Sequence, residues 1–140
     1  MSRKIARIAE EVSMIGPRIG RRILTDICQV SDIPHAQLFV VMMLVHKGPS
    51  RSADIMRELK VAAPTATGII DRLVKAGYVC RSTDAKDRRA VMVDLTPKGR
   101  TFATKLKGIV VKRWTETLAK ISEADAEKYL EILKKINEVI

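Results

Sequence analysis

A change in hydrophobic period at Tyr78 constrains the fold more than any other feature of the chain. Before that residue, apolar side chains recur every three or four positions, which is typical of helices. From there the period shifts toward two, which predicts strands over Tyr78–Arg81 and Val91–Leu95 around a polar insert, Ser82–Arg89. The helical period returns after Thr96-Pro97. The sequence therefore predicts a mainly α fold with a small, charged β-hairpin (α+β).

Four longer helices are expected outside the central region. Apolar residues spaced along Ile5–Ile27 predict a first helix of about 25 residues. A second helix is expected to begin at Pro34 with Asp32 as its cap, and its apolar run Leu38–Val45 predicts that it is buried in the domain centre. A fifth helix is expected to follow the hairpin, and Ser122 is expected to cap a sixth.

Two shorter helices, joined by a turn of three or four residues, are expected between the second helix and the hairpin. Ser52 is expected to cap the first of them, Ala53–Leu59. Pro64 suits the first turn of the next helix, and Gly77 is placed to end it in a left-handed conformation. That helix is expected to bury Ala66, Ile70, Leu73 and Val74 and to carry Thr65, Gly68, Arg72 and Lys75 on its opposite face.

The net charge predicts an acidic partner. The chain has 140 residues, which suits a single domain, 1–140, and its 26 Lys and Arg against 16 Asp and Glu give a net charge of +10. Between Asp71 and Arg100 there are eight basic residues and four acidic ones, whereas the segment Ser122–Ile140 is nearly balanced, so the basic character lies away from the C-terminal helix. Nucleic-acid phosphate is the obvious partner, and an ordinary solvated basic surface is the alternative.

The order of the central elements points to the same partner. Two short helices joined by a tight turn and followed by a basic hairpin match a helix-turn-helix with a wing. A helix fits the major groove of DNA, so the second short helix would meet base edges while Arg72 and Lys75 reach phosphates. A hairpin tip with guanidinium groups suits the narrower minor groove. For Thr65, Thr67 and Arg72 the alternative is an ordinary solvated helix face.

The same residues carry a family resemblance. Leu59–Gly77, LKVAAPTATGIIDRLVKAG, and the following YVCRSTDAKDRRAVMVDLTPKG resemble the recognition helix and wing of the MarR family of bacterial transcriptional regulators. The densest match combines Asp71-Arg72-Leu73 with Asp84–Arg89 and Leu95–Gly99. The resemblance covers essentially the whole chain. It implies a winged helix-turn-helix lobe over about 34–98 and dimerisation helices over about 3–30 and 98–140.

The resemblance also implies roles for individual residues. Arg89 would enter the minor groove, and Asp87 would brace the wing by pairing with a nearby Arg. The sequence departs from the family pattern at Ala62, Ala63 and Gly68, which stand where a serine cap, a polar residue and an arginine are frequent, so fewer side chains can reach bases. We therefore expect reduced affinity or unusual specificity. The candidate DNA-binding residues are Ser52, Ala63, Pro64, Thr65, Thr67, Gly68, Arg72, Lys75, Lys86, Asp87, Arg88 and Arg89.

Apolar faces on the first and the last two helices predict a homodimer. These faces are longer than a winged lobe can cover, and pairing with a second copy would bury them. The alternative is an intramolecular helical bundle in a monomer. A two-fold dimer would present two recognition helices about 34 to 36 Å apart and prefer an inverted-repeat operator in double-stranded DNA. The expected function is a sequence-specific DNA-binding transcriptional regulator, and the family resemblance implies that it acts as a ligand-responsive repressor.

Two rival readings of this function remain open. One is a winged-helix protein-interaction module with weak base reading, and the other is an oxidant-sensing regulator that uses Cys28 or Cys80. The resemblance implies a small aromatic or phenolic effector. His35, His46, Trp114 and Met42-Met43 could line its site, but Met and Trp at helical spacing are more often core residues, so no ligand site is assigned.

Other classes of protein are not indicated. The two histidines are 11 positions apart, which is not the spacing of a metal pair, and no CxxC occurs, so no metal and no cofactor are expected. Because the chain has no Ser-His-Asp order, HExxH, GxSxG or phosphate loop, we expect no enzyme. The longest apolar run is too short to cross a membrane and the first residues lack a signal's apolar stretch, so a cytoplasmic protein with no membrane partner is expected.

Overall fold

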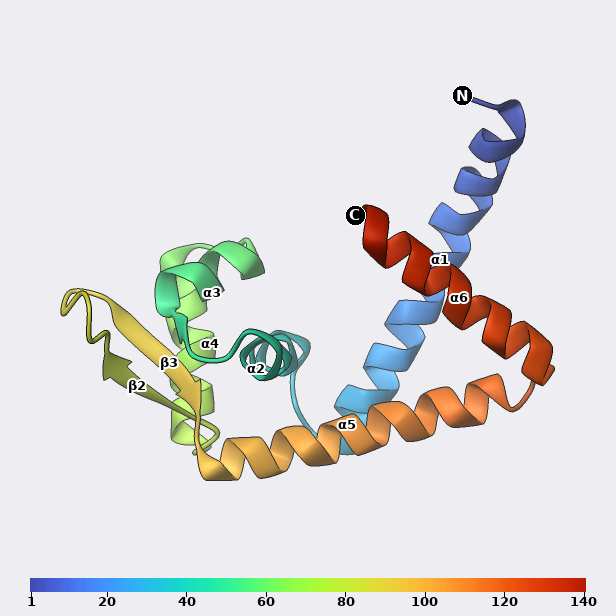
Figure 1. Ribbon diagram of the computed structural model, residues 1–140. Coiled ribbons are helices and arrows are strands. Elements are labelled where there is room, and N and C mark those ends of the chain that lie inside the picture. Colours follow the sequence, from blue (N-terminus) through green and yellow to red (C-terminus); the bar gives the residue numbers. More distant parts are fainter. The chain divides into compact units, whose positions relative to one another are not determined.

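The computed structural model describes all 140 residues and has a mainly helical fold with one small sheet (Figure 1). This confirms the fold class expected from the sequence. The residues form two compact units, Met1–Leu106 and Lys107–Ile140, which are described separately. The elements in chain order are α1 (Arg3–Ser31), α2 (His35–Lys47), β1 (Ser50–Arg51), α3 (Ser52–Leu59), α4 (Ala63–Lys75), β2 (Val79–Thr83), β3 (Val91–Leu95), α5 (Pro97–Leu118) and α6 (Glu123–Val139).

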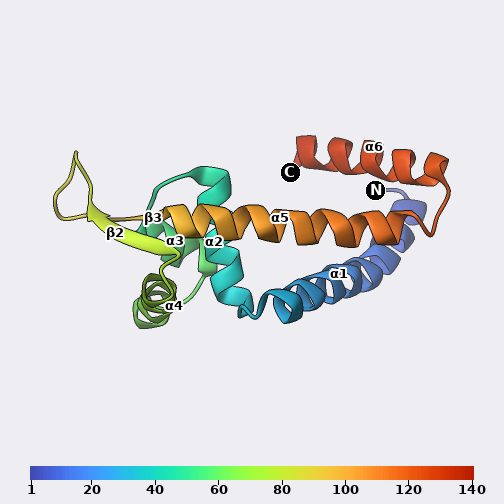
Figure 2. The ribbon, with the colours of Figure 1, turned by 90° about the horizontal axis from the view of Figure 1, so that it is seen from below.

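The sheet is antiparallel and has the strand order β1-β3-β2. The predicted hairpin is confirmed, with β2 and β3 paired from Val79 opposite Leu95 to Thr83 opposite Val91. The sequence did not predict β1, whose two residues are too few to establish an alternating pattern. Both ribbon views show the loop between β2 and β3 as a free loop at the end of the hairpin (Figures 1 and 2).

The core of the first unit lies between α2, α3, α4, the sheet and the start of α5. Burying a large aliphatic side chain contributes about 1.5 to 3 kcal/mol relative to leaving it in water. In α4, Ile69 joins the buried face, whereas Val74, which was expected on that face, is 37% exposed. The largest fully buried side chains are Leu44, Ile55, Ile70, Leu73, Leu106, Val40, Val41, Val79 and Val93.

Helix α2 is only partly buried, which corrects the expectation that it lies wholly in the core. Its buried residues are Leu38, Val40, Val41, Met43 and Leu44. Phe39, Met42 and Val45 are 48%, 37% and 49% exposed. A run that is apolar all round indicates which residues could be buried, but the elements available to pack against α2 cover only one side of it.

The helix ends agree only in part with the sequence. Asp32 adopts a left-handed conformation and ends α1, and the N-cap of α2 is Pro34, so Asp32 does not cap α2. Ser52 lies inside the first turn of α3 and its side chain makes no cap. Gly77 has the expected positive φ of 82°, and Ser122 caps α6 by accepting a hydrogen bond from a backbone N–H.

No single helix is long and apolar enough to cross a membrane. Only α1 and α2 taken together meet that test of length and composition, and they are bent by 94° against each other. The apolar residues of α2 that contribute to this test include five that are buried in the core of the first unit.

Candidate nucleic-acid interface

Helix α4 exposes a face made mostly of small residues. Thr65, Thr67, Arg72 and Lys75 are exposed, as are Ala63 and Pro64 at its start. No side chain caps its first turn, as expected from the alanine there. A Cβ built at Gly68 meets nothing within 4 Å, so packing inside the protein does not require glycine at that position. The helix thus offers two cations and two hydroxyls to a partner, with little side-chain bulk between them.

The loop between β2 and β3 carries three further cations. Lys86, Arg88 and Arg89 are exposed, and none of them forms an ion pair. Short-range bonds shape the loop: the Asp84 N–H donates to the Ala90 carbonyl at 3.1 Å, and the Ala90 N–H donates to the Asp87 carbonyl at 3.0 Å. This loop, residues 84–90, is the wing loop, and its unpaired cations are available to an anionic partner.

The brace of the wing differs from the one that the resemblance implied. The Asp87 carboxylate accepts the backbone N–H of Arg89 at 3.0 Å and pairs with no guanidinium group. The ion pair is made instead by Asp84, whose Oδ2 accepts a hydrogen bond from Arg51 at 2.7 Å. The backbone N–H of Lys86, and then the Arg51 guanidinium, lower the pKa of the Asp84 carboxyl.

A second ion pair connects α4 with the hairpin. The Arg81 guanidinium on β2 lies 2.5 Å from the Asp71 carboxylate on α4. The sequence predicted neither of these two ion pairs. Neither pair has the i, i+3 or i, i+4 spacing of a helix, because the partners are 33 and 10 residues apart in sequence. Only the assembled fold reveals them.

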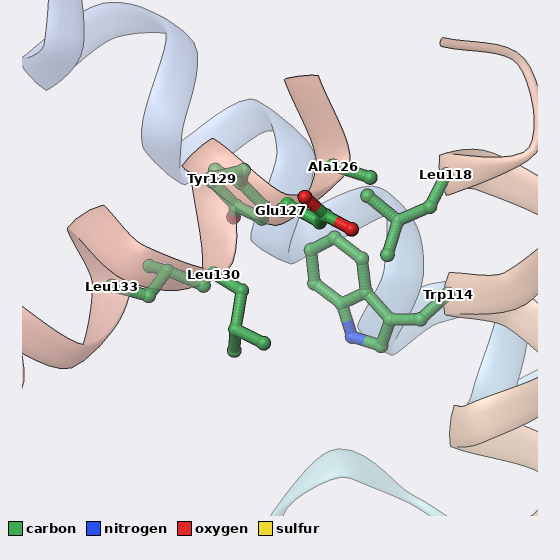
Figure 3. A pocket seen from close by; sticks show the side chains of 7 residues that line it. All are labelled: Trp114, Leu118, Ala126, Glu127, Tyr129, Leu130 and Leu133. Carbon is green, nitrogen blue, oxygen red and sulfur yellow. The ribbon is translucent and has the colours of Figure 1, made fainter. Parts of the chain in front are cut away.

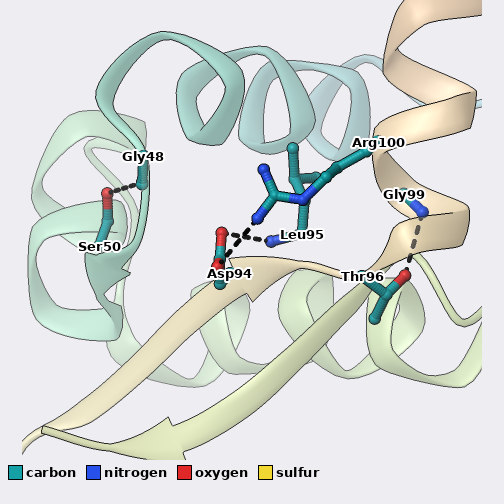
Figure 4. A network of polar contacts seen from close by, with 7 residues as sticks. All are labelled: Gly48, Ser50, Asp94, Leu95, Thr96, Gly99 and Arg100. Atoms are coloured by element: carbon teal, nitrogen blue, oxygen red, sulfur yellow. Dashed lines mark hydrogen bonds and ion pairs between the residues drawn. The ribbon is translucent and has the colours of Figure 1, made fainter.

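The motif Leu95-Thr96-Pro97-Lys98-Gly99 connects β3 to α5 and holds the start of α5 by hydrogen bonds. The Thr96 hydroxyl donates to the Gly77 carbonyl at 2.5 Å. The same oxygen accepts the Gly99 N–H at 3.0 Å (Figure 4). The Lys98 ammonium donates to the Ala76 carbonyl at 2.8 Å. These contacts fix the start of α5 against the turn after α4. This part of the family motif therefore has a structural role in the chain.

The cysteines and the tryptophan considered in the sequence analysis lie in α1, on β2 and in α5. Cys28 in α1 is half-buried, and burial raises the pKa of its thiol, whereas Cys80 on β2 is exposed. In the second unit Trp114 lines an apolar hollow of about 470 Å³ and its ring lies 6.0 Å from that of Tyr129 (Figure 3). The other residues lining the hollow are Leu118, Ala126, Glu127, Leu130 and Leu133.

These features define a class of protein: two helices joined by a tight turn, and a small sheet whose basic loop projects beside them, form a winged helix-turn-helix domain. Comparisons with known proteins support this class. The model of the MarR family matches residues 33–91. The chain is 33% identical over 107 residues to the uncharacterized HTH-type transcriptional regulator YfiV of Bacillus subtilis, which covers 74% of this chain and 67% of YfiV.

Two further similarities agree with that match. The uncharacterized HTH-type transcriptional regulator YkoM of Bacillus subtilis is 29% identical over 96 residues, which is 69% of this chain and 62%, less than two thirds, of YkoM. The crystal structure of wild-type MarR from Escherichia coli in its apo form superimposes with a TM-score of 0.77 at 23% identity, covering 94% of each chain. This chain belongs to the MarR family, and the relatives' class, transcriptional regulators, agrees with the expectation that it is not an enzyme.

Proposed function

We propose that this protein is a sequence-specific regulator of transcription that binds double-stranded DNA. The observation that carries the proposal is a set of exposed cations on α4 and the wing loop that have no ion-pair partner in the protein. They are Arg72, Lys75, Lys86, Arg88 and Arg89. Elsewhere in the same lobe, exposed cations such as Lys47, Arg57 and Arg100 are paired with carboxylates. Unpaired cations on a helix and an adjoining hairpin suit the phosphates and grooves of a duplex.

The two elements are expected to divide the work of recognition. The Arg89 guanidinium suits the minor groove, whose negative potential attracts it without strong discrimination among sequences. The hydroxyls of Thr65 and Thr67 lie on the exposed face of α4, where they can reach base edges in the major groove. The small side chains around them leave few groups that discriminate bases, so specificity rests on few contacts.

Binding to the DNA that flanks the protein's own gene, compared with random DNA at several salt concentrations, tests this function. We expect Arg89→Ala to weaken binding to both DNAs and to reduce the salt slope by about 1. Thr65→Ala and Thr67→Ala are expected to change the preferred sequence. Arg100→Ala, which removes a cation already paired with a carboxylate 3.3 Å away, is the control and should bind like the wild type.

The outcomes separate the alternatives. Tight, preferential binding to the flanking DNA supports a sequence-specific regulator. Equal and salt-sensitive binding to both DNAs contradicts base reading at this site and favours a nonspecific winged helix. Absence of binding overturns the proposal in favour of a protein-interaction module. If Thr65→Ala weakened binding to specific and random DNA equally, as expected for Arg89→Ala, the division of labour would be contradicted.

The proposed regulator is a homodimer that binds an inverted repeat. The apolar stripe of α1 is exposed in the first unit, with Ile5, Val12 and Ile15 all more than half exposed. In the second unit α6 has no buried residue although it carries Leu130, Leu133 and Ile136. A second copy would remove these side chains from water. Light scattering at micromolar concentration should give twice the chain mass for the wild type and less for Ile15→Glu. A wild-type monomer would contradict this part of the proposal.

The proposed regulator acts in the cytoplasm, at a bacterial promoter, as a repressor that a small aromatic effector releases. The apolar hollow at Trp114 offers aromatic surface for such a ligand. Trp114 is the only tryptophan of the chain, so its fluorescence reports on this hollow directly. Titration with simple phenols and benzoates should change that fluorescence and weaken DNA binding together. A ligand that weakens DNA binding without affecting the fluorescence would place the effector site elsewhere.

A further inference from the structure

A contact between Arg51 and Asp84 at the base of the wing loop joins this loop to β1. Arg51 is the last residue of β1, and its Nη2 donates to Asp84 Oδ2 at 2.7 Å across 33 residues of sequence. The other carboxylate oxygen of Asp84, Oδ1, accepts the backbone N–H of Lys86 at 3.0 Å. The Asp84 side chain is only 16% exposed. Both of its oxygens therefore have partners, one from the sheet and one from the loop.

This contact ties the wing loop to the start of the helix-turn-helix. Strand β1 lies on the far side of β3 from β2, so the Arg51 side chain reaches across the central strand to the residue that follows β2. Arg51 is also the N-cap residue of α3. The remaining hydrogen bonds of the loop are local to residues 84–90. The Arg51 side chain is thus a tie between the loop and a part of the chain distant in sequence.

The positive charge of Arg51 is paired with a carboxylate of the protein itself. Its guanidinium faces a carboxylate, unlike the unpaired groups of Lys86, Arg88 and Arg89. The backbone bond from Lys86 and the guanidinium keep the pKa of Asp84 low, so the carboxylate is ionised at neutral pH. Without Arg51, this ionised carboxylate would keep only the backbone N–H of Lys86 as a partner, and the loop would lose its side-chain contact with β1.

We propose that Arg51 is a wing-positioning residue: it holds Asp84, and through Asp84 the wing loop, in the orientation in which Lys86 and Arg89 reach DNA. This inference rests on the DNA-binding function proposed above. It assigns Arg51 no contact of its own with DNA. A direct phosphate contact by Arg51 is the competing role, and the two roles make different predictions about salt dependence.

The first test uses the free protein, without DNA. Trypsin cleaves after Lys86, Arg88 and Arg89, so the rate of cleavage within the loop reports on its opening. We expect Arg51→Gln to raise that rate about twofold to fivefold, the range for loss of one partly exposed ion pair. Arg100→Gln removes another Arg–Asp pair, between α5 and β3 and outside the loop, and should be cleaved like the wild type. Wild-type cleavage of Arg51→Gln would overturn the proposal.

The second test measures DNA binding as a function of salt. Arg51→Gln is expected to lower affinity about twofold to fivefold and to leave the salt slope at the wild-type value. Arg89→Ala should reduce the slope by about 1. If Arg51→Gln reduces the slope by the same amount, Arg51 contacts phosphate and the positioning role is wrong. If the wild type shows no salt-sensitive binding, the DNA-binding function fails, while the tryptic result still decides the role of Arg51 in the loop.

A second variant, Asp84→Asn, tests the same contact in case Arg51→Gln does not fold. Asp84→Asn removes the ion pair and keeps a side-chain oxygen able to accept the Lys86 N–H. It should reproduce the faster cleavage, and Arg51→Gln combined with Asp84→Asn should be cleaved no faster than either single variant, since both act through one contact. Additive effects of the two substitutions would show that they act independently and would contradict the proposal.

Discussion

Replacing Gly99 by alanine is expected to destabilise the lobe, although alanine is the better helix former. An ideal Cβ at this position would lie 1.9 Å from the carbonyl oxygen of Tyr78 and 3.3 Å from Leu95 Cδ2. The first of these atoms belongs to the backbone and cannot rotate away. The ring of Phe102 stacks on that of Tyr78 at 4.2 Å, and the Thr96 N–H donates to the Tyr78 carbonyl at 3.0 Å, so the start of α5 is held in place.

The size of the effect follows from what must move. Relieving the clash by shifting α5 weakens the cap at Thr96, which is worth about 1 kcal/mol, and a backbone hydrogen bond worth about 1 kcal/mol. Residual overpacking costs about 1 to 3 kcal/mol, and the gain in helix propensity returns about 1 kcal/mol. We expect Gly99→Ala to lower the free energy of unfolding by about 2 to 4 kcal/mol in total.

Urea unfolding followed by circular dichroism, at one fixed protein concentration, measures this change. Gly68→Ala is the matched control, because Gly68 is also helical and a Cβ there meets nothing within 4 Å. We expect the control to raise the free energy of unfolding by about 0.5 to 1 kcal/mol. A Gly99→Ala protein as stable as the wild type, alongside the usual gain at Gly68, would refute the reasoning about this close approach.

Two further predictions concern titratable groups. Iodoacetamide at neutral pH should modify the exposed Cys80 faster than Cys28, because Cys28 is half-buried and burial raises the pKa of its thiol. The single variants Cys28→Ser and Cys80→Ser assign the two reaction rates to the two thiols. A faster reaction at Cys28 would contradict the burial argument. The side-chain hydrogen bond from Lys47, at 2.6 Å, and then its charge lower the pKa of the Glu58 carboxyl, so this pair stabilises the fold above the ordinary pKa of Glu and the contribution is lost as the pH falls through the lowered value. Lys47→Met should raise the Glu58 pKa toward its ordinary value in an NMR titration, and an unchanged pKa would mean that the charges of Lys60 and Arg57 are responsible.

Features that depend on neighbouring residues were predictable. The hairpin followed from the alternation of side chains, since strands place successive residues on opposite faces. The left-handed residue at Gly77 and the cap at Ser122 follow from conformational freedom and from one side-chain oxygen within reach of a backbone N–H. The same local logic placed the caps of α2 and α3 incorrectly. At Asp32 the chain turns sharply out of α1, and the side chain of Ser52 makes no cap.

The candidate site was predictable as a set of charges but not as a geometry. The sequence alone places Arg72 and Lys75 on one face of a helix and Arg88 and Arg89 in a loop, because these placements depend only on helical and strand periods. It could not identify Arg51 as a partner of the wing. That contact requires β1 to pair with β3, and two residues carry no pattern from which such pairing can be inferred.

The sequence by itself determined the types of the main elements, their order, and the presence of basic residues on the second short helix and in the wing. These depend on local periodicity and on composition. Tertiary structure alone decided that Asp84, rather than Asp87, braces the wing, that Ile69 replaces Val74 in the core, and that α2 keeps one apolar side exposed. The physical reason is that ion pairs and burial depend on which distant segments meet, and that is settled only when the whole lobe packs around its core.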